Sequence, residues 1–340
     1  MVGCPWEPDF SKLAAVLERG KPDRPVLFEL FIDDSLIKTV TGVSWPVNDW
    51  VKRDTAYIKA NEILGHDYAV VTGSGLNFPK GQREGRRTVS LNDGALINDR
   101  DDFNNYPWPD PDEFSTERLD KLAEALPGGM ELMIWPPDGL FELVVGLTGY
   151  ENLCYMLYDD MPLAEDLFAE AGKRYLRYFE LCLRHRRVSA VVSSDDWGFK
   201  TGTMLSAEHF RKLVFPWHRE LARLAHESGR YAILHSCGNT DEIMDDIIDM
   251  GYDAKHSFED EIWPIEDAYS DLHGKIGVLG GIDVDFLARG DIGEIIERAD
   301  RLLELSDCRG GYALGSGNSI PEYVPAPNFF AMTEAAYRHL

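Results

Sequence analysis

Cysteine and long apolar runs are both scarce in this sequence. The five cysteines are spread irregularly over 340 residues, so no disulfide framework is visible and a reducing compartment is expected. No apolar run approaches the ~18 residues that a transmembrane helix needs. The first residues, MVGCPWEPDF, lack the basic and apolar regions of a secretory signal. These absences favour a cytoplasmic protein that does not span a membrane.

Basic charge is also in short supply. The chain has 34 basic and 59 acidic residues, which gives a formal net charge of −25. A field of that sign repels phosphate backbones and anionic lipid surfaces, so neither nucleic acid nor a membrane is an expected partner. The glycine fingerprint GxGxxG does not follow the first expected strand, which counts against a dinucleotide-binding open sheet.

Short apolar segments alternate with amphipathic stretches along the whole chain. Several of the apolar segments have almost no polar residue, which is typical of parallel strands buried on both faces. Eight strand–helix alternations predict a single-domain (β/α)₈ TIM barrel, with a doubly wound open sheet as the alternative. The expected strands are PVLFELFI (25–32), DYAVVTG (67–73), MELMIWP (130–136), AVVSSDD (190–196), YAILHSC (231–237), AKHSF (254–258), IGVLGGID (276–283) and YALGSGN (312–318).

One stretch interrupts this alternation. Residues 74–112 are rich in turn-forming residues, and we expect an inserted hairpin or lid after the second strand. A local basic cluster within it, formed by Arg83, Arg86 and Arg87, is the place to expect an acidic ligand or partner. Among the helices, the pattern over 206–229 starts at a serine and ends at a glycine, with a kink or break expected at Pro216.

The carboxyl ends of the strands, where a barrel has its active site, carry the candidate chemistry. His235 and Cys237 are two residues apart on one strand, so their side chains point to the same side. Neutral imidazole and thiolate are both good zinc ligands, and Glu259 at the end of the next strand is a candidate third ligand. The alternative is a core cysteine beside a hydrogen-bonded histidine.

Aspartates and glycines end two other strands. Asp195 and Asp196 are candidates for a general base, a cation ligand or a substrate anchor, and the alternatives are a solvated loop or a helix cap. Gly280 and Gly281, followed by Asp283, allow close approach of a ligand to the backbone or simply a turn.

The last strand ends in the sequence GSGN. Its Ser316 is a candidate ligand-binding residue, because barrels often bind phosphate after strands seven and eight. A plain tight turn is the alternative for this element, since no Lys or Arg follows it directly.

The pattern over 190–332 resembles the uroporphyrinogen decarboxylase superfamily. The segments that carry the resemblance are SSDDWGFKTGTMLSAEHFRKLVFPWHRELARLAHESG, AILHSCGNT, IDMGYDAKHSF, VLGGIDVDFL and YALGSGNSIPEYVPAPNFFAM. Within the superfamily, the sequence is most similar to the branch of methyltransferases that act on methyl-corrinoids and thiols such as coenzyme M, and RPVLFELFIDDSLIKTVTG also fits that branch. The resemblance implies a (β/α)₈ barrel with a deep cleft at the strand ends.

The resemblance also implies a metal site and shows where the chain departs from the pattern. Zinc methyltransferases of this branch bind metal through a His-x-Cys pair, here His235 and Cys237, and a late cysteine; a glutamate near Glu259 can complete the set. Asn318 occupies the place of the late cysteine, and Cys308 should lie at the other end of the barrel. The arginine-rich stretch of the true decarboxylase is missing, since FELFIDDSLI has acids in its place.

Three functions follow from the resemblance. The first is a corrinoid-linked methyltransferase, in which zinc lowers the pKa of a thiol, or an acid such as Asp195 or Asp196 protonates a small substrate as its methyl group moves to a corrinoid. The corrinoid would come on a separate carrier protein, because nothing here resembles a cobalamin-binding domain. The second is a decarboxylase acting on a porphyrinogen, and the third is a non-catalytic corrinoid- or tetrapyrrole-binding protein.

Overall fold

A curled parallel sheet forms the centre of the protein. The computed structural model describes residues 3–73, 75–81 and 90–340. In this part of the chain, seven strands pair in parallel in the order β1-β2-β3-β6-β7-β8-β9. They are β1 (Tyr68–Thr72), β2 (Glu131–Trp135), β3 (Val188–Ser194), β6 (Tyr231–His235), β7 (Ala254–His256), β8 (Gly277–Leu279) and β9 (Tyr312–Ala313). The last seven expected strands are thereby confirmed; six are shorter than expected, and β3 has the expected length but begins two residues earlier.

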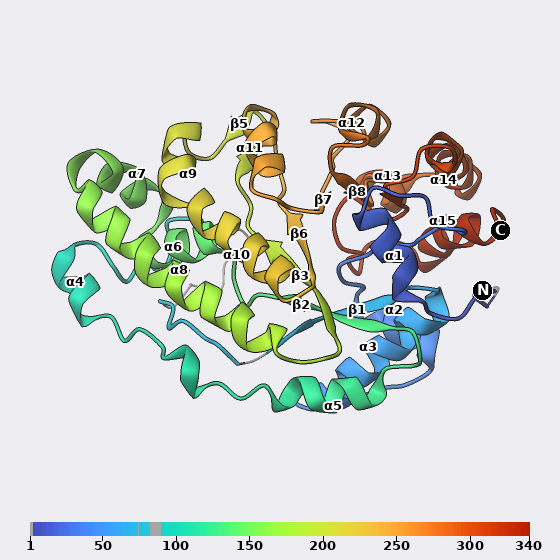
Figure 1. The fold of residues 1–340 in the computed structure, drawn as a ribbon, viewed down its shortest axis with the longest axis horizontal. Coiled ribbons are helices and arrows are strands. Elements are labelled where there is room, and N and C mark those ends of the chain that lie inside the picture. Colours follow the sequence, from blue (N-terminus) through green and yellow to red (C-terminus); the bar gives the residue numbers. More distant parts are fainter. Residues whose placement is uncertain (1–2, 74, 82–89) are drawn as a thin grey trace.

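Helices surround the sheet (Figure 1). Long helices α8 and α10 lie on one flank of the strands, and α13, α14 and α15 lie on the other, near both termini. The helices are α1 (Phe10–Leu17), α2 (Asp34–Thr41), α3 (Trp50–Leu64), α4 (Arg100–Asn105), α5 (Glu117–Ala125), α6 (Leu140–Thr148), α7 (Tyr150–Asp159), α8 (Met161–Leu183), α9 (Ala207–Leu213), α10 (Phe215–Glu227), α11 (Met244–Asp249), α12 (Ile265–Leu272), α13 (Val284–Arg289), α14 (Ile292–Asp307) and α15 (Ala326–Tyr337). Short 3₁₀ turns, η1 (Pro111–Glu113) and η2 (Asp241–Ile243), and a hairpin of β4 (Gly198–Phe199) and β5 (Gly202–Thr203) complete the elements.

The curl of the sheet divides its apolar side chains into an inner and an outer set. Alternate residues of a strand face opposite sides. The inner set takes residues from every strand of the sheet, for example Val70, Val192 and Ile233, and packs with α1 in one small buried cluster. The outer set, which includes Ile134 and Leu234, packs against the surrounding helices in a larger cluster. Convergence of seven strands on one inner core is what a barrel-like curvature produces.

The first expected strand, 25–32, is irregular in the structure. Its Leu27 and Ile32 make single parallel bridges to Leu314 and Ile320, and its inner residues join the inner core. Toward β1, side-chain hydroxyls take the place of a backbone ladder. The Tyr68 hydroxyl accepts from the Glu29 N–H at 2.7 Å and donates to the Glu29 carbonyl at 2.8 Å. The prediction of a regular strand was wrong here because a tyrosine already satisfies these backbone groups.

The helix boundaries agree with the local signals. The pattern 206–229 is broken into α9 and α10 next to Pro216, and the Ser206 side chain caps α9 by accepting from the His209 N–H. The described parts of the stretch 74–112, namely 75–81 and 90–112, contain α4 and η1 and no strand. Arg83, Arg86 and Arg87 lie outside the described residues. Within the described chain, no helix combines the length and the apolar character that crossing a membrane requires.

Substituting Gly315 should test how tightly segment 25–32 is joined to the end of β9. A Cβ at this position would collide with the carbonyl oxygen of Phe28, a backbone atom that cannot move away cheaply. We expect Gly315→Ala to lower the free energy of unfolding by about 3 kcal/mol, measured by urea denaturation. Gly128→Ala is the control, because a Cβ there meets nothing within 4 Å. Equal stability of the two variants would contradict close packing of segment 25–32 against the end of β9.

Candidate functional site

Three potential metal ligands meet where β3 and β6 end. Ser194 is paired with His235 in the sheet register, so Asp196 and Cys237, two residues beyond, emerge side by side. The His235 Nε2 lies 3.4 Å from the Cys237 Sγ and 4.0 Å from the Asp196 Oδ1. One ligand atom from each of the three residues lies within 4.8 Å of the others. An imidazole, a thiol and a carboxylate in this arrangement are a donor set that suits zinc.

Hydrogen bonds hold Cys237 in this position. Its backbone N–H donates to the Asp196 Oδ1 at 2.8 Å. Its sulfur accepts from the Asn318 Nδ2 at 3.3 Å and from the Ser257 hydroxyl at 3.5 Å. Burial, and then the charge of Asp196, raise the pKa of the Cys237 thiol well above its ordinary value. A cation at the site would have the opposite effect and favour the thiolate.

Two residues expected near the metal take different places. Asn318, in the position of the late cysteine, reaches the Cys237 sulfur with its amide and therefore does lie at the site. The Glu259 carboxylate accepts from the Gly238 N–H at 3.1 Å and is outside the three-residue set, in which Asp196 stands instead. Cys308 ends α14 before β9 begins, at the amino ends of the strands, as expected from the sequence.

A second histidine, His256, which the sequence analysis did not single out, is hydrogen-bonded to His235. His235 and His256 are register partners on β6 and β7, and their Nδ1 atoms are 2.8 Å apart. The His256 Nε2 lies 3.1 Å from the carbonyl oxygen of Ser316. Burial lowers the pKa of His235 to about 3, and burial followed by the charge of His235 lowers that of His256 well below its ordinary value. Both imidazoles are therefore neutral at physiological pH.

Asp195 and Asp196 point in different directions. The Asp195 carboxylate is fully buried and accepts from the N–H groups of Phe141 and Glu142 at 2.9 and 3.0 Å, at the start of α6. It also lies 3.0 Å from the His218 Nε2. Asp195 thus anchors a helix, while Asp196 lies on the cavity side. The register of a strand end decides this difference, and the sequence alone leaves it open.

The glycine–aspartate sequence after β8 shapes the backbone around Ser316. Gly280 and Gly281 both have positive φ angles, and a Cβ at Gly280 would collide with the Ser316 carbonyl oxygen. The Gly281 N–H donates to that same oxygen at 2.9 Å. The Asp283 side chain caps α13 by accepting from the N–H groups of Asp285 and Phe286. These residues build the loop that holds Ser316.

Glu29 connects the first strand segment with Ser316. Its carboxyl oxygens lie 2.7 Å from the Ser316 N and 2.6 Å from the Ser316 Oγ. The same hydroxyl lies 2.9 Å from the Asn318 carbonyl oxygen. Burial raises the pKa of Glu29 to about 8. A protonated Glu29 can donate to the Ser316 hydroxyl while that hydroxyl donates to Asn318, so every oxygen is satisfied.

A Glu29→Gln variant should reveal this proton. Between the ordinary pKa of 4.5 and the raised value of about 8, the folded state holds a proton that the unfolded state has lost. Wild-type stability should therefore fall as pH rises through this window, by on the order of 1 kcal/mol per pH unit. The glutamine keeps the hydrogen bonds without titrating, so its stability relative to wild type should increase from pH 5 to pH 8 in urea unfolding. Glu124→Gln, on an exposed face of α5, is the control. A constant difference between Glu29→Gln and wild type would contradict a protonated Glu29.

Two cavities open beside the site. The larger, of about 770 Å³, is bordered by Asn318, Glu259 and Asp283. The smaller, of about 320 Å³, is lined by Asp196 and has an apolar wall that includes Phe141, Val145, Phe199 and Met204. Glu142 also lines it, and desolvation followed by the charges of Asp195 and Asp196 raises the pKa of Glu142.

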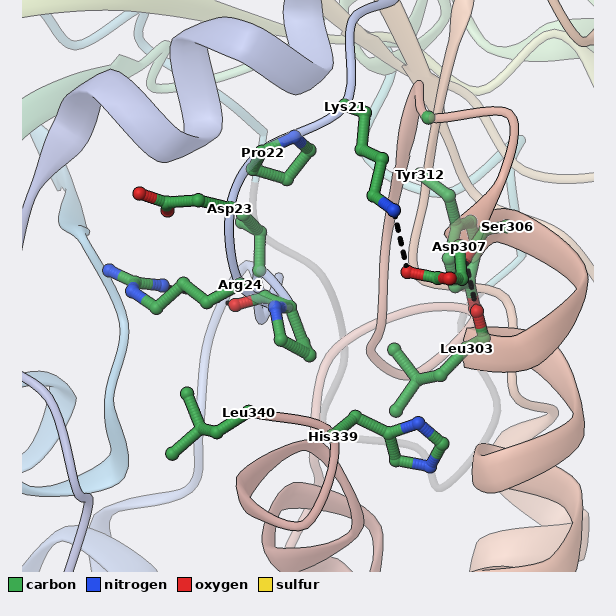
Figure 2. Close-up of a pocket in the computed structure, with 13 residues that line it drawn as sticks. Lys21, Pro22, Asp23, Arg24, Leu303, Ser306, Asp307, Tyr312, His339 and Leu340 are labelled. Carbon is green, nitrogen blue, oxygen red and sulfur yellow. Dashed lines mark hydrogen bonds and ion pairs between the residues drawn. The ribbon is translucent and has the colours of Figure 1, made fainter.

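A third cavity, of about 270 Å³, lies at the opposite end of the strands. Figure 2 shows the residues that line it. Residues 21–26, which precede the first strand segment, and the beginning of β9 border it. The Lys21 ammonium lies 3.0 Å from Asp307 across its mouth. Parallel barrels carry their chemistry at the carboxyl ends of the strands. This cavity is therefore not part of the candidate site.

The comparisons with known proteins show the family and the fold of this chain. Residues 95–339 match the family model of uroporphyrinogen decarboxylase (URO-D), a range that contains Asp196, His235, Cys237 and Asn318. A methyltransferase from Methanosarcina mazei has a similar fold, with a TM-score of 0.69 and 18% identity over 96% of this chain and 97% of that chain.

A putative vitamin-B12 independent methionine synthase from Listeria monocytogenes has a TM-score of 0.46 and 11% identity, over 93% of this chain and 98% of that chain. The search of curated proteins found no match. The family model covers more than half of the sequence, and the chain therefore belongs to the uroporphyrinogen decarboxylase (URO-D) family.

Proposed function

We propose that this protein is a corrinoid-linked methyltransferase. It would move a methyl group between a small methylated substrate, or a thiol, and a corrinoid on a separate carrier protein. The observation that carries the proposal is the convergence of Asp196, His235 and Cys237 within 4.8 Å at the carboxyl end of the sheet. The fold shared with a methyltransferase supports it. We also infer a (β/α)₈ barrel in which segment 25–32 serves as the first strand, because its inner residues join the inner core.

A zinc-class ion fits the residues at the site. Asp196, His235 and Cys237 would hold it, and Asn318 would contact the sulfur ligand. Three protein ligands with space for another are typical of catalytic rather than structural zinc sites. Such an ion supplies Lewis acidity, which lowers the pKa of a bound thiol or polarises a substrate oxygen.

The neighbouring cavities offer room for a substrate. The smaller cavity has an apolar wall for methyl groups and places the carboxyl groups of Asp196 and Glu142 on its surface. When a methyl group leaves an oxygen or nitrogen atom for Co(I), the leaving atom takes up a proton. Because Asp196 would hold the ion as a carboxylate, Glu142, whose pKa is raised, is the group in the described lining that would exchange this proton.

The charge of the larger cavity disfavours uroporphyrinogen decarboxylation, despite the family name. Its described lining contains two basic residues, Lys200 and Arg289, and both are paired with acids. A tetrapyrrole with several carboxylates would meet repulsion here. The acidic residues that line the cavity are Glu259, Asp260, Glu261, Asp283, Asp285 and Glu294.

The proposal is tested with the wild-type protein. Purified under reducing conditions, it should carry about one equivalent of zinc by elemental analysis. It should also transfer a methyl group to Co(I) cobalamin from at least one member of a panel of methoxy compounds, methylamines and methyl thiols. Absence of both the metal and the transfer would refute the proposal. Release of carbon dioxide from uroporphyrinogen would favour the decarboxylase instead.

A further inference from the structure

His256 lines neither of the two cavities beside the site and does not contact the Cys237 sulfur. Its hydrogen bonds nevertheless determine which ring nitrogen of His235 carries the hydrogen. A carbonyl oxygen can only accept, so the His256 Nε2 must carry the hydrogen that points to Ser316 at 3.1 Å. His256 is fully buried, which disfavours its doubly protonated form. Its Nδ1 is therefore unprotonated and accepts a hydrogen bond.

The same reasoning continues to His235. The two Nδ1 atoms are 2.8 Å apart, so one must donate and the other accept. Because the His256 Nδ1 accepts, the His235 Nδ1 carries the hydrogen. A neutral imidazole has a single N–H, and the His235 Nε2 is left with its lone pair. That lone pair lies 3.4 Å from the Cys237 sulfur and 4.0 Å from the Asp196 carboxylate.

The fold fixes the Ser316 carbonyl, the group to which His256 donates. The Ser316 carbonyl oxygen also accepts from the Gly281 N–H at 2.9 Å, and the Ser316 N–H donates to Glu29 at 2.7 Å. Both partners are backbone groups or buried side chains, so the acceptor of the His256 hydrogen cannot turn away. The opposite tautomer of His235 would place a hydrogen on Nε2, where it would block a metal ion.

We propose that His256 is a positioning residue that fixes His235 as the Nδ1–H tautomer and so presents the Nε2 lone pair to an ion held with Cys237 and Asp196. The role in metal binding rests on the proposed function, but the tautomer does not. In metal sites, a hydrogen bond to the second ring nitrogen of a ligating histidine orients the ring, and its loss costs 10- to 100-fold in metal affinity. Here another imidazole would take the place of the usual carboxylate or carbonyl acceptor.

The tautomer can be measured without any metal. In the full-length metal-free protein labelled with ¹⁵N-histidine, long-range ¹H–¹⁵N spectra should show His235 protonated at Nδ1 and His256 protonated at Nε2. Assignment uses the His235→Gln and His256→Gln variants, each of which removes one set of signals. A His235 protonated at Nε2 in the wild type would overturn the proposal.

Variants at His256 then test the link to metal affinity. In His256→Gln, the amide can still accept from His235 and donate to Ser316, so zinc affinity should stay within a few-fold of wild type in competition with a chromophoric chelator. In His256→Leu, both bonds are lost, and affinity should fall 10- to 100-fold with a changed visible spectrum of the Co²⁺-loaded site. His66→Leu removes another fully buried histidine, one that precedes β1, and should leave both readouts unchanged.

The possible outcomes separate the two proposals. If His256→Leu binds zinc as tightly as wild type, the positioning role is wrong. If the leucine variant does not fold, the wild-type tautomer and the affinity of the glutamine variant decide the question. If the tautomer is as expected but no form of the protein binds zinc or cobalt, the metal-dependent function fails while the assignment of the tautomer stands.

Discussion

Replacing Cys237 with serine should reduce zinc affinity and the rate of methyl transfer by at least ~100-fold. The loss should exceed the 10- to 100-fold that is typical of residues supporting a ligand, because Cys237 would bind the ion directly. A thiolate is a much better zinc ligand than a neutral hydroxyl. Serine is nearly the same size, and the Cys237 backbone N–H keeps its bond to Asp196, so the fold should survive. Elemental analysis and the cobalamin assay measure the two effects.

Cys308→Ser is the matched control for this prediction. It makes the same chemical change at an exposed position, at the end of α14 and away from the strand ends that carry the site. Zinc content and transfer rate of this variant should equal those of the wild type. Equal zinc content in the Cys237 and Cys308 variants would show that the sulfur at the site is not a ligand.

Replacing Asp195 with alanine should lower the free energy of unfolding by ~3–5 kcal/mol, as expected when one member of a buried polar network is removed. The carboxylate accepts from two backbone N–H groups at the start of α6 and contacts His218, and its bonds to Phe141 and His218 are buried. Alanine leaves the buried Phe141 N–H and His218 without this partner. Urea denaturation followed by circular dichroism measures the change.

Asp196→Ala is the control for Asp195→Ala. It should lose zinc affinity and transfer rate but little stability, whereas Asp195→Ala should lose stability. Asp196 is partly exposed and lines the small cavity, so Asp196→Ala should cost about 1 kcal/mol of stability or less. Its zinc affinity and transfer rate should nevertheless fall far below those of the wild type. If Asp196→Ala is more destabilised than Asp195→Ala, the assignment of a structural role to Asp195 and a ligand role to Asp196 is wrong.

The strands and the histidine–cysteine pair could be predicted from the sequence because both depend on local periodicity. Alternation along a strand places His235 and Cys237 on one side, and the structure brings them within 3.4 Å. The choice of a third ligand depends on loop paths beyond the strand ends, which no periodicity describes. Glu259 was expected there, and in the structure it is Asp196 whose carboxylate oxygen lies within 4.8 Å of the His235 and Cys237 ligand atoms.

His256 carried a signal that could have been used. It stands two residues after the inward-facing Ala254 and is the register partner of His235 on the adjacent strand. A histidine at an inner position of the neighbouring strand is a candidate partner for a ligand histidine. The irregularity of 25–32, by contrast, results from the hydroxyl of Tyr68, a contact between segments that sequence alone does not reveal.

The bond between Glu29 and Ser316 has a consequence for how the site is assembled. It joins positions 287 residues apart, so it cannot form until nearly the whole chain has been synthesised. During synthesis, Asp196, His235 and Cys237 leave the ribosome well before Ser316. If the proposed metal site exists, a nascent chain would thus display its three side chains before the Ser316 carbonyl that holds His256 has been made. We expect metal uptake to follow release of the finished chain.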